Sequence, residues 1–156
     1  LITLPCYEWE HVLVVPPSHP LATKERIGLD DLAIEPLITY HPSFTGRNKI
    51  DAAFAARQLH PRVVLEAIDS DVIKTYVRLG LGIGIVAEMA MREDPGVDLV
   101  ARPLGHLFGQ SVARVAFKRG AYLRNFVYKF AETLSDRLSR DLIIRAMQGE
   151  PSDYSL

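Results

Sequence analysis

The stretch "RLGLGIGIVA", residues 78–87, places three glycines between a segment with helical spacing and a run of apolar, partly β-branched residues. Glycines at this spacing resemble a dinucleotide-binding loop, but such a loop follows a strand and opens a helix, whereas here the order is reversed. We therefore predict that Gly80 ends the helix in the left-handed backbone region. Gly82 and Gly84 are expected where the chain packs closely against a neighbour.

The same alternation of helix and strand continues on both sides of this stretch. The helix before the glycines, residues 71–79, follows Asp69 and Ser70, which are both good N-cap residues, and Val72, Ile73, Tyr76 and Val77 are expected on one of its faces. Further strands are predicted at residues 11–15, 36–40, 62–67, 83–87, 99–103 and 111–117. Further helices are predicted at 29–33, 46–59, 123–134 and 142–147. This alternation is typical of an α/β domain.

Composition limits the class of protein. A chain of 156 residues with 48% hydrophobic residues is long enough to bury a core, as one domain or two small lobes. Its 18 basic and 19 acidic residues give a net charge of −1, so the chain lacks the basic excess that DNA binding requires. The single Cys6 excludes an internal disulfide and fits a reducing compartment. No apolar run is long enough for a membrane span. We expect a cytoplasmic protein with no membrane association.

Catalytic patterns are not found. The five histidines are scattered, and no pair has the i, i+4 spacing that a helical metal site would suggest. They are expected to be surface or hydrogen-bonded histidines. Cys6 has no local cation to activate it, and no G-x-S-x-G sequence is present. The acidic pairs, Asp30 with Asp31 and Asp69 with Asp71, sit where helix starts favour carboxylates. We expect no enzyme, no cofactor and no metal site.

A second stretch, "HPSFTGRNKI" at residues 41–50, lies after a predicted strand and before a predicted helix. Open α/β sheets bind ligands at this position, because the strand's carboxyl end and the helix's amino end meet there. Thr45 is expected to cap the helix through its hydroxyl, leaving the amides of Gly46, Arg47 and Asn48 for a small anion. The alternative is an ordinary helix start, with Thr45 only a cap and Arg47 solvated.

Four stretches carry a family resemblance: "LPCYEWEHVLVVPPSHPL" (4–21), "FTGR" (44–47), "SDVIKTYVRLGLGIGIVAEMA" (70–90) and "FKRGAYLRNFVYKF" (117–130). Together they resemble the effector-binding domain of LysR-type transcriptional regulators, in the CysB/Cbl-like sulfur-metabolism branch. The helix, "GLG" and strand order is typical of LysR regulators in general. "FTGR" and "DVIKTYVRLGLGIG" are more specific to the branch.

The resemblance implies a type 2 periplasmic-binding-protein-like fold, with two Rossmann-like α/β lobes and an effector in the cleft between them. Residues 1–110 would supply a crossover strand and the effector-binding second lobe. Residues 111–150 would form the returning strand and helices of the first lobe, and 151–156 a tail. The first part of the first lobe and a DNA-binding winged helix-turn-helix domain would precede this chain. The full-length relative would form a homo-oligomer, expected to be a tetramer.

The resemblance also implies the site. Thr45 corresponds to a cleft threonine that binds the effector anion, with Gly46 and Arg47 beside it. Ser43 offers a second hydroxyl, and Trp9 an aromatic wall, although hinge packing is an equal alternative for Trp9. Sulfate, an acetylserine and adenosine phosphosulfate are all candidate effectors. The implied function is control of sulfur assimilation, cysteine biosynthesis or sulfonate use. A transporter's solute-binding protein is the alternative, and an enzyme a distant third.

Overall fold

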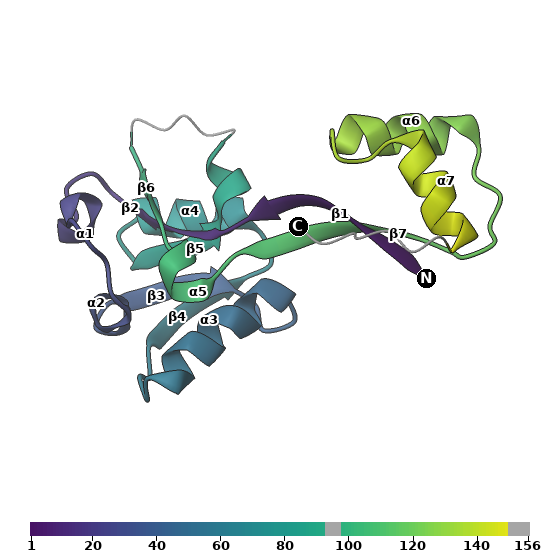
Figure 1. Cartoon of the computed structure of the whole chain (residues 1–156). Coiled ribbons are helices and arrows are strands. Elements are labelled where there is room, and N and C mark those ends of the chain that lie inside the picture. Colours follow the sequence, from purple (N-terminus) through teal and green to yellow (C-terminus); the bar gives the residue numbers. More distant parts are fainter. Residues whose placement is uncertain (93–97, 150–156) are drawn as a thin grey trace. The chain divides into compact units, whose positions relative to one another are not determined.

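The computed structural model describes residues 1–92 and 98–149 and divides the chain into two units. One unit is the continuous segment Trp9–Ser111, and the other combines Leu1–Glu8 with the chain from Val112 onward (Figure 1). The expected tail at 151–156 lies outside the described residues. Among the helices that the structure describes, none is both long and apolar enough to span a membrane.

The continuous unit is built on a five-stranded sheet in the order β4-β3-β5-β2-β6. β3 lies parallel to both β4 and β5, whereas β2 runs antiparallel to β5 and β6. The predicted α/β class is confirmed, as is the expectation that residues 36–40, 62–67 and 83–87 share one sheet. The strands are β2 (His11–Val15), β3 (Pro36–Tyr40), β4 (Arg62–Ala67), β5 (Ile83–Ala87) and β6 (Val100–Pro103).

Apolar residues alternate along these strands to bury both faces of the sheet. Leu13 and Leu37 belong to one core cluster, and their neighbours Val14 and Ile38 to another on the opposite face. This follows from the two-residue period of a strand. The helices of this unit are α1 (Pro20–Thr23), α2 (Leu29–Ala33), α3 (Thr45–Ala56), α4 (Ser70–Arg78), the 3-10 helix η1 (Glu88–Met91) and α5 (Gly105–Phe108).

The glycines of residues 78–87 behave as predicted. Gly80 follows the end of α4 with φ of +76°, a conformation that favours glycine. A Cβ on Gly82 would lie 2.2 Å from the carbonyl oxygen of Pro36, and one on Gly84 would lie 2.9 Å from Cγ2 of Val77. The missing side chains therefore let β5 approach β3 and let α4 lie close on the sheet.

The buried face of α4 is narrower than predicted. Ile73 and Val77 are fully buried against the sheet, but Val72 and Tyr76 are 41% and 38% exposed. Lys74 takes the remaining buried position, with its amine bonded to the carbonyl oxygen of Ala90. A long cationic side chain can bury its methylene stem in this way while its charged end keeps polar partners.

The second unit holds all but the last residue of β1 (Ile2–Trp9) and all but the first residue of β7 (Ser111–Phe117), and these two strands pair. It also contains α6 (Asn125–Leu134) and α7 (Arg140–Gln148). Its core contains Leu4 and Cys6 from the start of the chain and Ile143 from near its end. The helix predicted at 123–134 begins at Asn125, and the apolar side chains of the predicted range are divided between core and surface. Leu123 and Val127 pack against this core, but Phe126 and Phe130 are 64% and 66% exposed, and Leu134 is also exposed.

Candidate functional site

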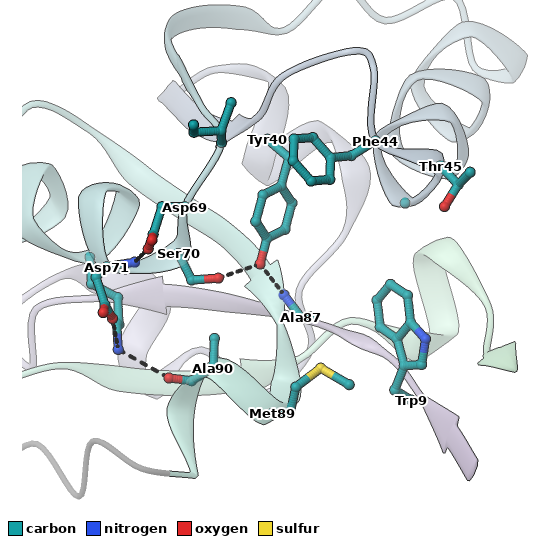
Figure 2. A pocket seen from close by; sticks show the side chains of 13 residues that line it. Trp9, Tyr40, Phe44, Thr45, Asp69, Ser70, Asp71, Ala87, Met89 and Ala90 are labelled. Carbon is teal, nitrogen blue, oxygen red and sulfur yellow. Dashed lines mark hydrogen bonds and ion pairs between the residues drawn. The ribbon is translucent and has the colours of Figure 1, made fainter. Parts of the chain in front are cut away.

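A cavity of about 820 Å³ opens on the continuous unit, at the carboxyl ends of β3 and β5. The amino ends of α3 and α4 and the start of η1 complete its walls. Figure 2 shows Thr45 and Trp9 on one side of Tyr40, and Asp69, Ser70 and Asp71 on the other. This is the strand-end position where open α/β sheets bind ligands.

The amino end of α3 differs from the prediction in two ways. The helix begins at Thr45, and its N-cap is Phe44, which makes no side-chain cap bond. The expected cap by the Thr45 hydroxyl is therefore wrong. The amide of Arg47 is also occupied, because it donates to the carbonyl oxygen of Phe44 at 3.0 Å.

Thr45 and Gly46 have polar groups that remain available in the cavity. Within the part of the chain that the structure describes, neither the hydroxyl nor the amide of Thr45 has a hydrogen-bond partner, and neither does the amide of Gly46. Thr45 and Gly46 both line the cavity. Free amides at the start of a helix carry partial positive charge, so this end of the cavity can accept an anionic group.

Arg47 lies away from the cavity lining and is neither solvated nor free. Its side chain is buried and donates from Nε to Asp51 at 2.8 Å. Its Nη1 donates to Oε1 of Glu66 at 2.8 Å and to the carbonyl oxygen of Tyr40 at 2.7 Å. Burial alone would lower the pKa of Arg47, but the hydrogen bonds to Asp51 and Glu66 outweigh it and raise the pKa. Arg47 thus fixes the loop before α3.

Ser43 is exposed and also lies outside the cavity lining. Its hydroxyl is 2.9 Å from Nδ1 of His41, and its amide donates to the same nitrogen at 3.2 Å. The structure therefore brings Thr45, Gly46 and Trp9 together at the cavity, and it leaves Ser43 and Arg47 outside it.

Trp9 approaches α3 closely because residue 46 is a glycine. A Cβ on Gly46 would lie 3.2 Å from Cη2 of Trp9 and 3.1 Å from Nε2 of His11. Both distances are shorter than ordinary van der Waals contacts. Gly46 therefore lets the indole and the imidazole pack directly against the helix backbone.

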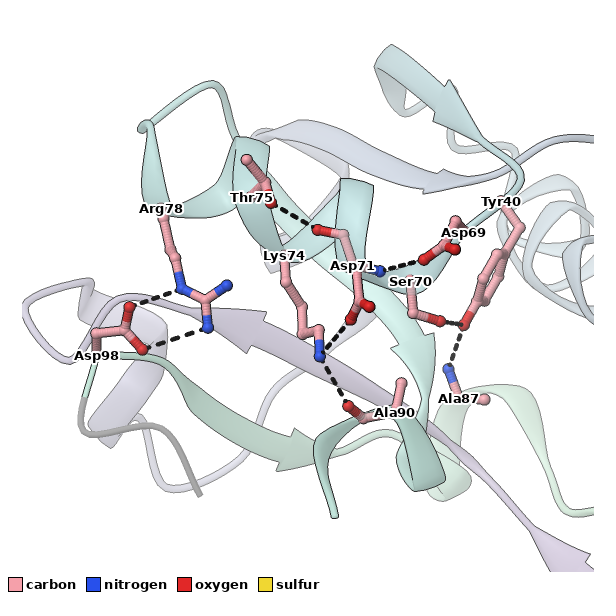
Figure 3. Close-up of polar contacts among 10 residues, drawn as sticks. All are labelled: Tyr40, Asp69, Ser70, Asp71, Lys74, Thr75, Arg78, Ala87, Ala90 and Asp98. Atoms are coloured by element: carbon pink, nitrogen blue, oxygen red, sulfur yellow. Dashed lines mark hydrogen bonds and ion pairs between the residues drawn. The ribbon is translucent and has the colours of Figure 1, made fainter. Parts of the chain in front are cut away.

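Tyr40 is a cavity residue that the sequence did not single out. Its hydroxyl lies 2.7 Å from the hydroxyl of Ser70 and accepts a 3.1 Å hydrogen bond from the amide of Ala87 (Figure 3). These bonds join the ends of β3 and β5 to the start of α4. The ring of Phe44 lies 5.8 Å from that of Tyr40, tilted by 38°. The only signal in the sequence is that Tyr40 ends a predicted strand.

The far side of the cavity carries opposite charges in close contact. Nζ of Lys74 lies 2.8 Å from Oδ1 of Asp71, and Asp69 caps α4 by accepting from the amide of Asp71 at 2.6 Å. These residues appear together in Figure 3. No group of three histidine, cysteine or acidic residues suited to a metal ion is found within residues 1–92 and 98–149.

A two-unit α/β chain whose helix amino ends line a ligand-sized cavity has the architecture of a small-molecule-binding domain. Residues 1–139 match the model of the LysR substrate binding domain, and the chain belongs to that family. The type 2 periplasmic-binding-protein-like fold inferred from the sequence is thereby confirmed.

Close relatives place the chain within the family. The chain is 54% identical to the HTH-type transcriptional regulator CysB of Burkholderia cenocepacia, over all 156 of its own residues and 50% of that protein. It is 48% identical over 139 residues to the regulator SsuR of the same species, covering 89% of this chain and 45% of SsuR. The chain thus spans about half the length of the curated relatives it matches.

A solved structure agrees with this placement. The cofactor-binding domain of the Cbl transcriptional regulator has a TM-score of 0.83 and 43% identity, covering 94% of this chain and 64% of that one. The predicted membership of the branch that includes CysB and Cbl is confirmed.

Proposed function

We propose that this chain senses a small sulfur-related anion for a LysR-type transcriptional regulator of sulfur assimilation, cysteine biosynthesis or sulfonate use. The observation that carries the proposal is the pair of residues at the start of α3. Thr45 and Gly46 line the cavity, and neither the Thr45 hydroxyl nor their two amides has a partner among the described residues. The names of its relatives, CysB, SsuR and Cbl, supply the sulfur context.

Neutral donors suit such an anion. A sulfate or sulfonate group needs several hydrogen bonds, and each bond from an amide or hydroxyl to a charged oxygen is stronger than a bond between neutral groups. Helix amides supply these bonds without placing a second charge in the site. A contact from Arg47 is not needed, because its guanidinium is engaged by Asp51 and Glu66.

The volume of the cavity is larger than the smallest candidate effector needs. A cavity of about 820 Å³ lies in the range of drug-sized ligand sites, so a single sulfate would fill only the part beside α3. The rings of Trp9, Tyr40 and Phe44 add apolar surface that a larger ligand can cover. Sulfate, an acetylserine and adenosine phosphosulfate all carry or expose groups that fit one end of this cavity, and their relative affinities are the quantity to measure.

The proposed mechanism is differential binding. By resemblance to the family, the complete effector domain has two conformations, and the effector stabilises the one that it contacts more fully. The resulting shift alters the geometry of a homo-oligomer, expected to be a tetramer, whose winged helix-turn-helix domains bind DNA. The expected location is the cytoplasm.

The alternative is the solute-binding protein of a transporter, which shares the lobe architecture. The family match and the regulators among the relatives favour the sensing domain. The region upstream in the parent gene separates the two: a helix-turn-helix supports the regulator, and a secretion signal the transporter. A catalytic role has the least support, since the relatives named above are transcriptional regulators.

Binding is tested directly with the tryptophan of the cavity. Trp9 is the only tryptophan of the chain, so its fluorescence reports on this site alone. Titration with sulfate, an acetylserine and adenosine phosphosulfate should give a saturable change for at least one of them. Chloride at matched ionic strength is the control for general salt effects. A linear response to all three would contradict the proposal.

A further inference from the structure

The side chain of His11 on β2 is fully buried, and its ring lacks a hydrogen-bond partner within residues 1–92 and 98–149. Both ring nitrogens are inaccessible to solvent and unpaired within the part of the chain that the structure describes. A buried polar group without a partner destabilises a fold, so such a group calls for a physical explanation. The sequence predicted surface or hydrogen-bonded histidines, and for His11 that prediction is wrong.

The surroundings of His11 are aromatic. Its ring centroid lies 5.0 Å from that of Trp9 at 62°, and 5.8 Å from that of Phe108 at 80°. Both pairs are T-shaped, the arrangement in which the edge of one ring meets the face of another. Phe108 continues the series, with its centroid 6.1 Å from that of Phe54 on α3.

His11 also faces the start of α3. Its Nε2 would lie 3.1 Å from a Cβ on Gly46, the residue whose amide opens into the cavity. Trp9 therefore lies between the cavity and His11, and both rings rest against Gly46. Neither Phe108 nor His11 lines the cavity itself.

The imidazole is neutral at physiological pH. Burial, and secondarily the charge of Lys49 on α3, lower the pKa of His11 from 6.5 to about 4. The partial positive charge of the α3 amino end disfavours a proton there as well. A neutral imidazole keeps an aromatic edge with a polarised N–H, which matches the electron-rich face of a neighbouring ring better than an aliphatic side chain does.

We propose that His11 is a positioning residue for effector binding: its ring, supported by Phe108, holds the indole of Trp9 against Gly46 and so preforms one wall of the cavity. The effector does not touch His11. The affinity part of this proposal rests on the proposed function, whereas the position of Trp9 does not. If His11 had only a structural role, replacing it would lower the stability of the fold and leave the environment of Trp9 unchanged.

The test uses the whole chain and three variants. His11→Leu removes the ring, and His11→Phe keeps a ring edge of similar size. Leu13→Ala is the matched control, because Leu13 lies two residues further along β2, is fully buried and does not line the cavity. For each variant, the thermal midpoint, the acrylamide quenching of Trp9 without effector, and the affinity for sulfate are measured.

His11→Leu is expected to raise the quenching constant of Trp9 about twofold or more and to weaken sulfate binding by about two- to tenfold, the range that an edge-to-face ring contact supports. His11→Phe should keep both values within about twofold of the native chain. Leu13→Ala should lower the thermal midpoint and change neither the quenching constant of Trp9 nor the affinity for sulfate.

Native quenching in a folded His11→Leu variant would overturn the proposal. Raised quenching of Trp9 in a folded His11→Phe variant would also overturn it. If His11→Leu does not fold, the His11→Phe variant alone tests the proposal. The two proposals fail separately. If no candidate effector binds the native chain while His11→Leu still exposes Trp9, the proposed function is wrong and the positioning role stands.

Discussion

Nη1 of Arg47 lies 2.8 Å from Oε1 of Glu66, and this contact joins the first turn of α3 to the end of β4. The same nitrogen donates to the carbonyl oxygen of Tyr40 at the end of β3. A residue expected to bind an anion directly therefore holds together the elements that surround the site.

Replacing Arg47 by methionine tests this role, because methionine keeps an apolar stem and removes every donor. The free energy of unfolding should fall by about 1.5–3 kcal/mol, the range for hydrogen bonds to charged groups. Urea denaturation measures it. Glu66→Gln is the control and should lower stability by less than about 1 kcal/mol, because Glu66 is 36% exposed. If Arg47→Met keeps its stability and abolishes sulfate binding, Arg47 contacts the effector after all.

Thr45→Ala should separate binding from stability. The hydroxyl of Thr45 caps nothing, so its removal should change the free energy of unfolding by less than about 0.5 kcal/mol. If the hydroxyl binds the effector anion, affinity should fall about ten- to a hundredfold. Thr45→Ser should keep most of the affinity. Calorimetric titration with sulfate and an acetylserine, paired with thermal melts, measures both effects. Equal affinity of the alanine variant and the native chain would contradict the contact.

Gly46→Ala should disturb the cavity with little net change in stability. Within a helix, alanine is favoured over glycine by about 1 kcal/mol. That gain is opposed here by the 3.2 Å approach of the new Cβ to Cη2 of Trp9 and by its 3.1 Å approach to Nε2 of His11. We expect a shift in the emission of Trp9 and weaker sulfate binding, with the thermal midpoint nearly constant. Unchanged emission would show that the indole does not press on the helix.

The burial of His11 predicts a pH dependence of stability. Its pKa is 6.5 unfolded and about 4 folded, so between these values the unfolded chain binds more protons than the folded chain. The contribution of His11 to the free energy of unfolding should therefore be constant above pH 6.5. It should fall by up to about 1.4 kcal/mol per pH unit as the pH drops towards 4. Denaturation across this range should show a smaller slope for His11→Phe, and an equal slope would refute the assignment.

The exposed side chains of α6 predict self-association of this chain. Phe126 and Phe130 present apolar surface that a stable monomer rarely leaves uncovered. Light scattering should show association that increases with concentration. Replacing both residues by glutamine should reduce it without a large change in the thermal midpoint, because neither side chain contributes to the core. A native chain that remains monomeric at high concentration would contradict this expectation.

Strand positions could be predicted well because they depend on local patterns. The runs "PLITY" and "IGIVA" are mostly apolar and lie next to or begin at a proline or glycine, and they form β3 and β5 at the predicted residues. The glycine positions 80, 82 and 84 were predictable for the same reason, since a backbone requirement leaves few alternatives to glycine.

The site was less predictable because its contacts join residues far apart in the sequence. Tyr40 and Ala87 meet only when β3 and β5 pair, and Arg47 meets Glu66 only through β4. The buried state of His11 depends on Phe108, almost one hundred residues away. A motif such as "FTGR" locates the helix start, but no local pattern shows which of its side chains turns towards the cavity.

The two units differ in how their residues are distributed along the chain. Trp9–Ser111 is continuous, whereas the other unit needs Leu4 and Cys6 from one end to meet Ile143 from the other. During synthesis, the continuous unit can fold as soon as β6 and α5 have emerged from the ribosome. Pairing β1 with β7 closes a loop that contains the whole continuous unit, so this contact should form more slowly than the contacts within that unit. The continuous unit, which carries the cavity, is therefore expected to fold before β1 and β7 pair.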